Sequence, residues 1–192
     1  MRDIDFWVTA IFAAYRHLPR AVRACRQTSA SLAESGFYCE DTLALVNKLI
    51  DCNARAESYI NAKVLADEAL SKLPLKYAQL LSLRARGDMT MEEIAAKLGY
   101  SKRSAFRWFA EGIKKAACVL KAEGYDEEWF SSRYSKDVLI GNYYQQAKKG
   151  ADVFCRAGNS CDRKKFKVKL EDAVAAGLLL KESRVASIAC CD

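Results

Sequence analysis

Two helix-boundary signals follow each other closely in the middle of the chain. Apolar residues recur at helical spacing from Ile94 to Leu98 and stop at Gly99, a residue that readily takes the left-handed conformation that ends helices. Ser101 follows, and serine is one of the preferred N-cap residues, so a second helix is predicted to start directly after it. Two helices joined by so short a turn predict a helix-turn-helix over residues 90–123.

The predicted helix-turn-helix has an inward side made of apolar residues. Thr90 and Glu93 have the spacing of a capping box, which fixes the start of the first helix. Gly124 is expected to end the second helix. The apolar residues expected to pack between the helices, one or other of the last two being only half-buried, are Ile94, Ala95, Leu98, Ala105, Trp108 and Phe109.

The outward side of the second helix carries basic and polar residues near its start, where helix-turn-helix proteins approach DNA bases. Arginine suits bidentate contact with guanine, and lysine can share that role or bind phosphate. Phe106 either touches a thymine methyl or folds back onto the protein. The alternative for the cations is an ordinary solvated helix face. The candidate DNA-binding residues are Thr90, Lys102, Arg103, Ser104, Phe106, Arg107 and Lys114.

The positive charge of the chain is concentrated on the same segment. The formal net charge is +7, and residues 84–121 contain nine Lys or Arg against four Asp or Glu. Residues 1–83 and 122–192 each carry a net charge of only about +1. A basic patch confined to one element is the footprint expected of a surface that faces phosphates.

The segment also resembles a known family. Residues 73–84, 89–95 and 99–101 are similar to the fourth conserved region of bacterial sigma factors, and the resemblance covers about residues 66–121. Residues 99–108 are closer still to phage late-transcription regulators of the ArpU type, which carry a sigma-like helix-turn-helix. In sigma factors this region reads the −35 promoter element and touches the β flap of RNA polymerase, so the resemblance implies both as partners.

The resemblance also implies roles for individual residues, although the chain departs from the family. The residues that would meet the major groove are Lys102, Arg103, Phe106 and Arg107. The helix start at Thr90 and the later Lys114 would meet phosphates. Trp108 is bulkier than the aliphatic residue usual there, and about 65 upstream residues lack the length and signatures of a promoter-melting domain. A self-sufficient sigma factor is therefore not expected.

The rest of the chain predicts an all-α fold, a helical bundle that contains the helix-turn-helix. Convincing strand patterns are few, and proline occurs only twice. Helices are predicted over about residues 4–18, 19–34, 41–72, 74–86 and 137–149. The inward faces expected for the last two comprise Leu73, Leu75, Ala78 and Leu81, and then Val138, Leu139 and Tyr143.

Three parts are expected along the chain. Residues 1–72 form an N-terminal helical region for bracing or oligomerisation, and residues 73–124 form the DNA-binding domain. Residues 125–192 form a mostly helical C-terminal extension of unknown role. Within it, the basic stretch 163–169 is either a solvated edge or an auxiliary nucleic-acid arm.

The sequence carries no motif of catalysis or of cofactor binding. A phosphate loop, a dinucleotide fingerprint and a paired-carboxylate metal motif are all missing, and His17 is the lone histidine, so neither an enzyme nor a cofactor is expected. The eight cysteines form no C-x-x-C pair and are expected to be reduced thiols. The cysteines of a looser alternative, a zinc site, are Cys155, Cys161, Cys190 and Cys191.

These observations lead to one main hypothesis and two alternatives. The main hypothesis is a sequence-specific transcription regulator of phage or mobile-element type that binds double-stranded DNA, with RNA polymerase and a second copy of the chain as further partners. One alternative is a DNA-packaging adaptor like a phage small terminase subunit, and the other is a polymerase-binding protein without DNA readout. The apolar stretch at residues 6–14 is far shorter than the roughly 20 residues that cross a bilayer, so a cytoplasmic protein without a membrane anchor is expected.

Overall fold

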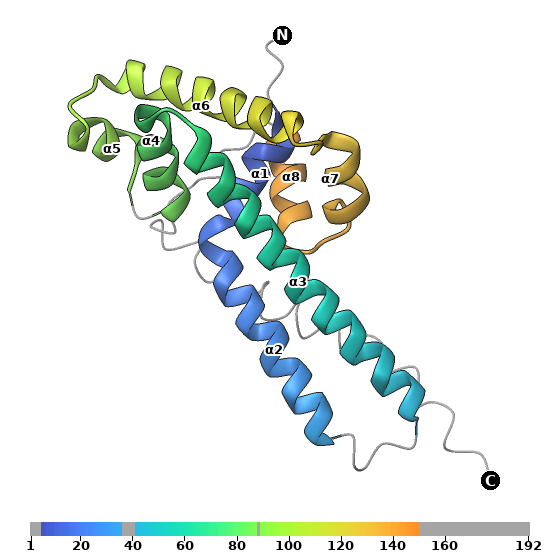
Figure 1. Ribbon diagram of the computed structural model, residues 1–192. Coiled ribbons are helices and arrows are strands. Elements are labelled where there is room, and N and C mark those ends of the chain that lie inside the picture. The colour runs from blue at the N-terminus through green and yellow to red at the C-terminus, as the bar shows by residue number, and fades with distance from the viewer. Residues whose placement is uncertain (1–4, 36–40, 88, 150–192) are drawn as a thin grey trace. The chain divides into compact units, whose positions relative to one another are not determined.

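The computed structural model describes residues 5–35, 41–87 and 89–149, all of which belong to one compact unit (Figure 1). Over these residues the fold is all-α and contains no strand, as predicted. The basic stretch 163–169 and the four cysteines of the zinc alternative lie outside the described residues. The elements are α1 (Phe6–Ala14), the 3-10 turn η1 (Tyr15–His17), α2 (Leu18–Ser35), α3 (Thr42–Lys72), α4 (Leu75–Arg86), α5 (Met91–Lys97), α6 (Lys102–Ala122), α7 (Glu127–Tyr134) and α8 (Ile140–Lys148).

The helix boundaries follow local sequence signals. Asp41 caps α3, and its carboxylate accepts a hydrogen bond from the amide of Ala44 at 2.9 Å. The helix stops at Leu73, whose extended backbone (φ −82°, ψ 148°) is the conformation favoured by a residue that precedes proline. Pro74 then occupies the N-cap position of α4, where its carbonyl accepts hydrogen bonds from the amides of Tyr77 and Ala78 at 2.9 and 3.1 Å.

The helices α2 and α3 run side by side in opposite directions and form a long hairpin (Figure 1). The buried side of α3 consists mainly of small residues, which allow neighbouring helices to approach closely. Several larger apolar residues of this helix are instead exposed. We call these residues the α3 stripe, and they are Leu43, Val46, Ile50, Ile60 and Val64.

The centre of the core is α1, whose residues from Trp7 to Ala14 are buried with the exception of the half-buried Thr9. It packs against α8, and the Trp7 ring lies 6.1 Å from that of Phe130 on α7. Tyr143 and Tyr144 are buried in this core, in line with the inward position predicted for the first of them.

The predicted inward position of Val138 is wrong. Its side chain is 37% exposed, because α8 begins only at Ile140 and Val138 lies in the turn before it. Asp137 organises this turn by accepting hydrogen bonds from the amides of Leu139 and Ile140 at 2.9 and 2.7 Å. Of the three residues expected to face inward here, the two that are buried are Leu139 and Tyr143.

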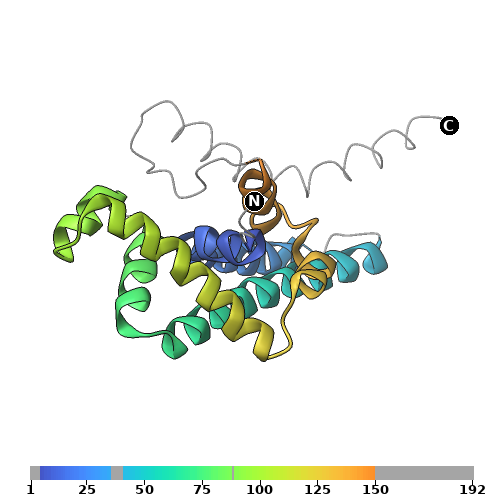
Figure 2. The same cartoon turned by 90° about the horizontal axis from the view of Figure 1, so that it is seen from above.

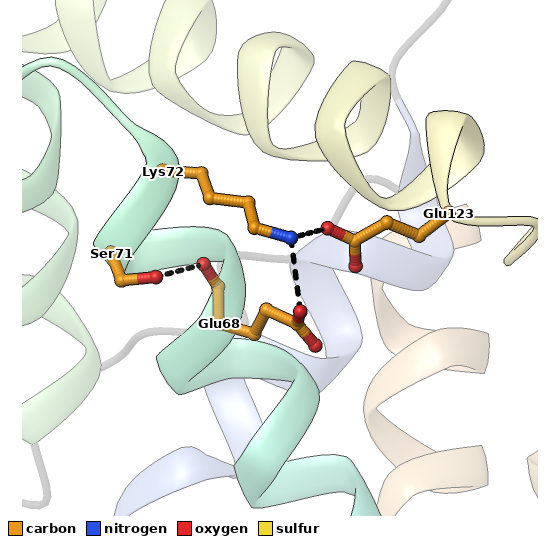
Figure 3. A network of polar contacts seen from close by, with 4 residues as sticks. All are labelled: Glu68, Ser71, Lys72 and Glu123. Atoms are coloured by element: carbon orange, nitrogen blue, oxygen red, sulfur yellow. Dashed lines mark hydrogen bonds and ion pairs between the residues drawn. The ribbon is translucent and has the colours of Figure 1, made fainter.

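Polar contacts join α3 and α6 at their C-terminal ends. Figure 3 shows the ammonium group of Lys72 between the carboxylates of Glu68 on its own helix and Glu123 at the end of α6. The Lys72–Glu68 distance is 3.0 Å. Because the lysine side chain is about half exposed, solvent screens both ion pairs and each adds little to the stability. They therefore help to set the end of α6, while apolar packing supplies most of the stability.

The single histidine makes stability depend on pH. Burial, followed by the charges of Arg16 and Arg20, lowers the pKa of His17 to about 4, and the neutral ring accepts a hydrogen bond from Nε of Arg16 at 2.8 Å. Between pH 6.5 and pH 4 the unfolded chain therefore binds a proton that the folded chain does not, so this part of the stability falls as the pH drops.

The free energy of unfolding, measured in urea, should fall between pH 7 and pH 5 by about 1–2 kcal/mol more in the wild type than in His17→Gln. Equal losses in the two proteins would show that His17 is not kept neutral.

Candidate nucleic-acid interface

The turn between α5 and α6 has the geometry that its sequence predicts. Gly99 has a φ of +70°, and its amide donates to the carbonyl of Ala96 at 3.2 Å. The amide of Tyr100 donates to the carbonyl of Ala95 at 2.8 Å, which completes a Schellman motif. Ser101 then caps α6 by accepting a hydrogen bond from the amide of Ser104 at 3.1 Å. The start of α6 is thus fixed relative to α5 by backbone contacts.

The start of α5 is fixed by the predicted capping box. The amide of Glu93 donates to the hydroxyl of Thr90 at 3.3 Å, and the amide of Thr90 donates to the Glu93 carboxylate at 2.7 Å. The Thr90 hydroxyl also donates to this carboxylate at 3.0 Å. Both hydrogen-bonding roles of the threonine side chain are thus engaged at the helix start.

A small apolar core holds α4, α5 and α6 together, and we call these three helices the helix-turn-helix unit. Its fully buried centre includes Leu80 of α4, which the predicted inward face did not include. The buried members are Leu80, Met91, Ile94, Ala95 and Ala105. The half-buried residues that pack against them are Leu83, Met89, Leu98, Trp108 and Phe109. Every residue predicted for the inward side of the two helices is therefore in or against this core.

The predicted inward position of Leu75 is wrong, because this residue is 72% exposed. It occupies the first position of α4, and the buried face of that helix is instead made by Leu80, Leu81, Arg84 and Ala85. Gly112 of α6 allows α4 and α6 to approach closely, since a Cβ atom at this position would lie 3.3 Å from the side chain of Leu81. The contact between α4 and α6 therefore sets the tilt of α6.

The side of α6 that faces away from this core is basic. The exposed candidates are Lys102, Arg103, Phe106, Arg107 and Lys114. Ser104 is half-buried and accepts a hydrogen bond from the hydroxyl of Ser101 at 2.9 Å. Figure 2 shows that α5 and α7 lie at opposite ends of α6. The candidate residues in the first turns of α6 are therefore at the end that adjoins α5.

The exposed cations differ in their surroundings. Lys102 forms an ion pair with Glu92 of α5, which holds its ammonium group close to the turn. Arg103, Arg107 and Lys114 form no ion pair within the described part of the chain, and Arg107 interacts electrostatically with Tyr77. An unpaired cation keeps its full charge for an external anion, so these three are the residues best suited to bind one.

Trp108 is held by residues that the sequence patterns did not single out. The ammonium group of Lys76 lies 3.6 Å above the indole ring, and Tyr100 meets the ring edge-on with centroids 4.3 Å apart. A cation over an indole ring contributes about 0.5–2 kcal/mol. Nearby, the hydroxyl of Tyr77 donates to Glu111 at 2.9 Å. These contacts join α4 to α6 and cover part of the Trp108 ring.

The described residues contain no group of three or more histidine, cysteine or acidic side chains that could hold a metal ion. Cys25 and Cys52 are buried free thiols, and burial raises the pKa of Cys25. Among the described helices, none combines the length and the apolar character needed to span a membrane.

Comparison with known proteins gives one match. Residues 63–115, from the last turns of α3 into α6, match the family model described as Sigma-70, region 4. No curated protein matches the chain, and no solved structure does. The matched residues include the whole core of the helix-turn-helix unit. This segment is therefore a sigma region 4-like helix-turn-helix, a DNA-binding kind of domain, within a chain more than three times its length.

Proposed function

We propose that this protein is a sequence-specific transcription regulator that reads a promoter-proximal DNA site through the first turns of α6. The observation that carries the proposal is the exposed, unpaired arginine pair Arg103 and Arg107 on a helix whose other side is locked against α4 and α5. A rigidly held helix with free guanidinium groups near its start has what base readout in the major groove requires.

In this proposal, some candidate residues contact DNA bases and others contact the phosphates of the DNA backbone. Arg103 and Arg107 contact base edges, Ser104 adds a contact of low selectivity, and Lys102 shares this task beside its partner Glu92. Lys114 lies about three turns along α6 and contacts phosphate. The start of α5 also lies against phosphate, through the amides of its first turn that the capping box leaves free, since the box engages both the hydroxyl and the amide of Thr90.

Selection from a random DNA library tests the proposal directly. The purified chain is incubated with the library at about 150 mM salt, and the retained DNA is sequenced. This salt concentration is used because contacts to the DNA phosphates, which carry no sequence information, dominate binding at low salt. An enriched motif of definite length supports a sequence-specific regulator. Salt-sensitive binding without any motif would overturn the proposal and would favour one of the alternatives below.

The phosphate contact of Lys114 leads to a separate prediction. Replacing this exposed residue by alanine should weaken binding to all sequences about equally and lower the slope of log K against log salt concentration by about one unit. Affinities measured at several salt concentrations check this, with Lys136→Ala, an exposed lysine between α7 and α8, as the control. An unchanged slope in Lys114→Ala would place Lys114 away from the DNA backbone.

We further propose that the α3 stripe joins two copies of the chain. Leu43, Val46 and Ile50 follow the three- and four-residue spacing of a coiled-coil seam. Ile60 and Val64 return to the same seam two heptads later, after polar residues at positions 53 and 57. A dimer would supply the second half-site contact that a single small unit lacks. Light scattering tests this, since Ile50→Asp should convert a dimer into a monomer, whereas a wild-type monomer would contradict the proposal.

The wider role that we propose is regulation in a phage or mobile element, similar to the ArpU type, with contact to RNA polymerase. The sigma region 4 match supports the polymerase contact, because that is the family whose members act with polymerase. Ring-shaped oligomers in light scattering would instead favour a packaging adaptor of the small-terminase kind. Capture of polymerase without retardation of any DNA would favour a polymerase-binding protein without DNA readout.

A further inference from the structure

One aromatic side chain of α6 is left in solvent. Phe106 is 51% exposed, and it is the one aromatic residue among the exposed large apolar residues of the described part. The other rings of this helix are placed differently, since Trp108 and Phe109 both pack against the core of the helix-turn-helix unit. Phe106 is therefore not buried against the protein, so half of its surface is available to a ligand.

The surroundings of Phe106 indicate which ligand it suits. It is adjacent to Arg107 and one turn from Arg103, and both are exposed cations. An apolar protein partner would have to desolvate both guanidinium groups to reach the ring, whereas a DNA groove supplies phosphates and acceptor atoms for them. In the major groove, the apolar group offered by an ordinary base is the C5-methyl group of thymine.

We propose that Phe106 is a specificity-determining residue that recognises thymine through its C5-methyl group. This inference rests on the proposed function, because it requires α6 to lie in the major groove. Residues three apart on a helix have Cβ atoms about 5–6 Å apart, and successive bases of one strand are about 3.4 Å apart along the axis. The thymine therefore lies within about two base pairs of the base contacted by Arg103.

Replacing thymine by deoxyuridine tests the inference, because the change removes only the methyl group. Each thymine of the selected site is replaced in turn, and affinity is measured for the wild type and for Phe106→Ala. One replacement near the bases read by arginine should weaken wild-type binding about 3–10-fold, the effect of losing the burial of one methyl group and of part of the ring. The same replacement should leave the affinity of Phe106→Ala unchanged, and Phe106→Leu should restore part of the effect.

The outcomes separate this inference from the function on which it rests. If a motif is selected but no deoxyuridine replacement weakens wild-type binding, the inference is wrong and the proposed function stands. An equal loss in wild type and Phe106→Ala would assign the methyl contact to another residue and also overturn the inference. If no motif is selected, the proposed function fails and the inference fails with it. Thermal unfolding of Phe106→Ala should match the wild type, since the ring is half in solvent.

Discussion

Replacing both Arg103 and Arg107 by alanine should weaken binding to the selected DNA site by about 10²- to 10⁴-fold. Each arginine can form a bidentate contact with guanine, which contributes about 1–3 kcal/mol of discrimination. Neither has an ion-pair partner within the described residues, so removing them leaves no buried charge behind. Each single substitution should cost about 1–3 kcal/mol and relax the base preference at one position of the motif.

Gel retardation with the selected site and with a scrambled site measures this effect. Binding to the scrambled site should fall much less, because nonspecific affinity comes mostly from phosphate contacts. Arg133→Ala is a matched control, since this arginine is also exposed but lies on α7. If the double variant and the control bind the selected site equally well, base readout does not involve the start of α6.

The parts of the structure that the sequence predicted correctly are governed by short-range interactions. The capping box at Thr90, the left-handed Gly99 and the serine cap of α6 each depend on atoms within five residues. Such contacts form in the same way in any fold that contains the segment. These signals also fix the residue at which α6 starts. Its inward and outward sides could therefore be predicted from the apolar spacing that follows.

The buried face of a helix is harder to predict when apolar residues occur all around it. In α4, leucines occupy positions 75, 80, 81 and 83, and periodicity alone assigned Leu75 to the core. The structure buries Leu80 instead, because α5 and α6 both lie against that side. The same difficulty affects α3, where small residues such as Ala62 and Ala66 are buried while Ile60 and Val64 are exposed.

Contacts between distant parts of the chain had no sequence signal at all. Arg16 donates a hydrogen bond to the carbonyl of Gly87 at 3.1 Å, and Tyr59 donates to Asp137 at 2.8 Å. Lys76 lies over Trp108 only because α4 and α6 cross where they do. Pairs separated by 30 to 80 positions become neighbours through the packing of whole helices. The exposed basic side of α6 and the apolar residues beneath it could therefore be predicted, but the long-range contacts that hold the helices in place could not.

Leu80→Ala should lower the free energy of unfolding by about 2–5 kcal/mol, the largest stability effect expected in the helix-turn-helix unit. Leu80 is fully buried and is the residue through which α4 enters the core shared with Ile94 and Ala105. Alanine would leave a cavity between the three helices, and the close packing of a protein interior cannot relax enough to fill it. Urea unfolding followed by circular dichroism measures the loss.

Leu75→Ala removes the same atoms from the same helix and is the matched control. Because Leu75 is 72% exposed, its replacement should change the free energy of unfolding by less than about 0.5 kcal/mol. Near the lowered unfolding transition of Leu80→Ala, DNA binding should be lost together with helical structure, since α6 is held in place by this core. A larger loss in Leu75→Ala than in Leu80→Ala would mean that α4 buries the face predicted from periodicity, and that Leu80 does not support the position of α6.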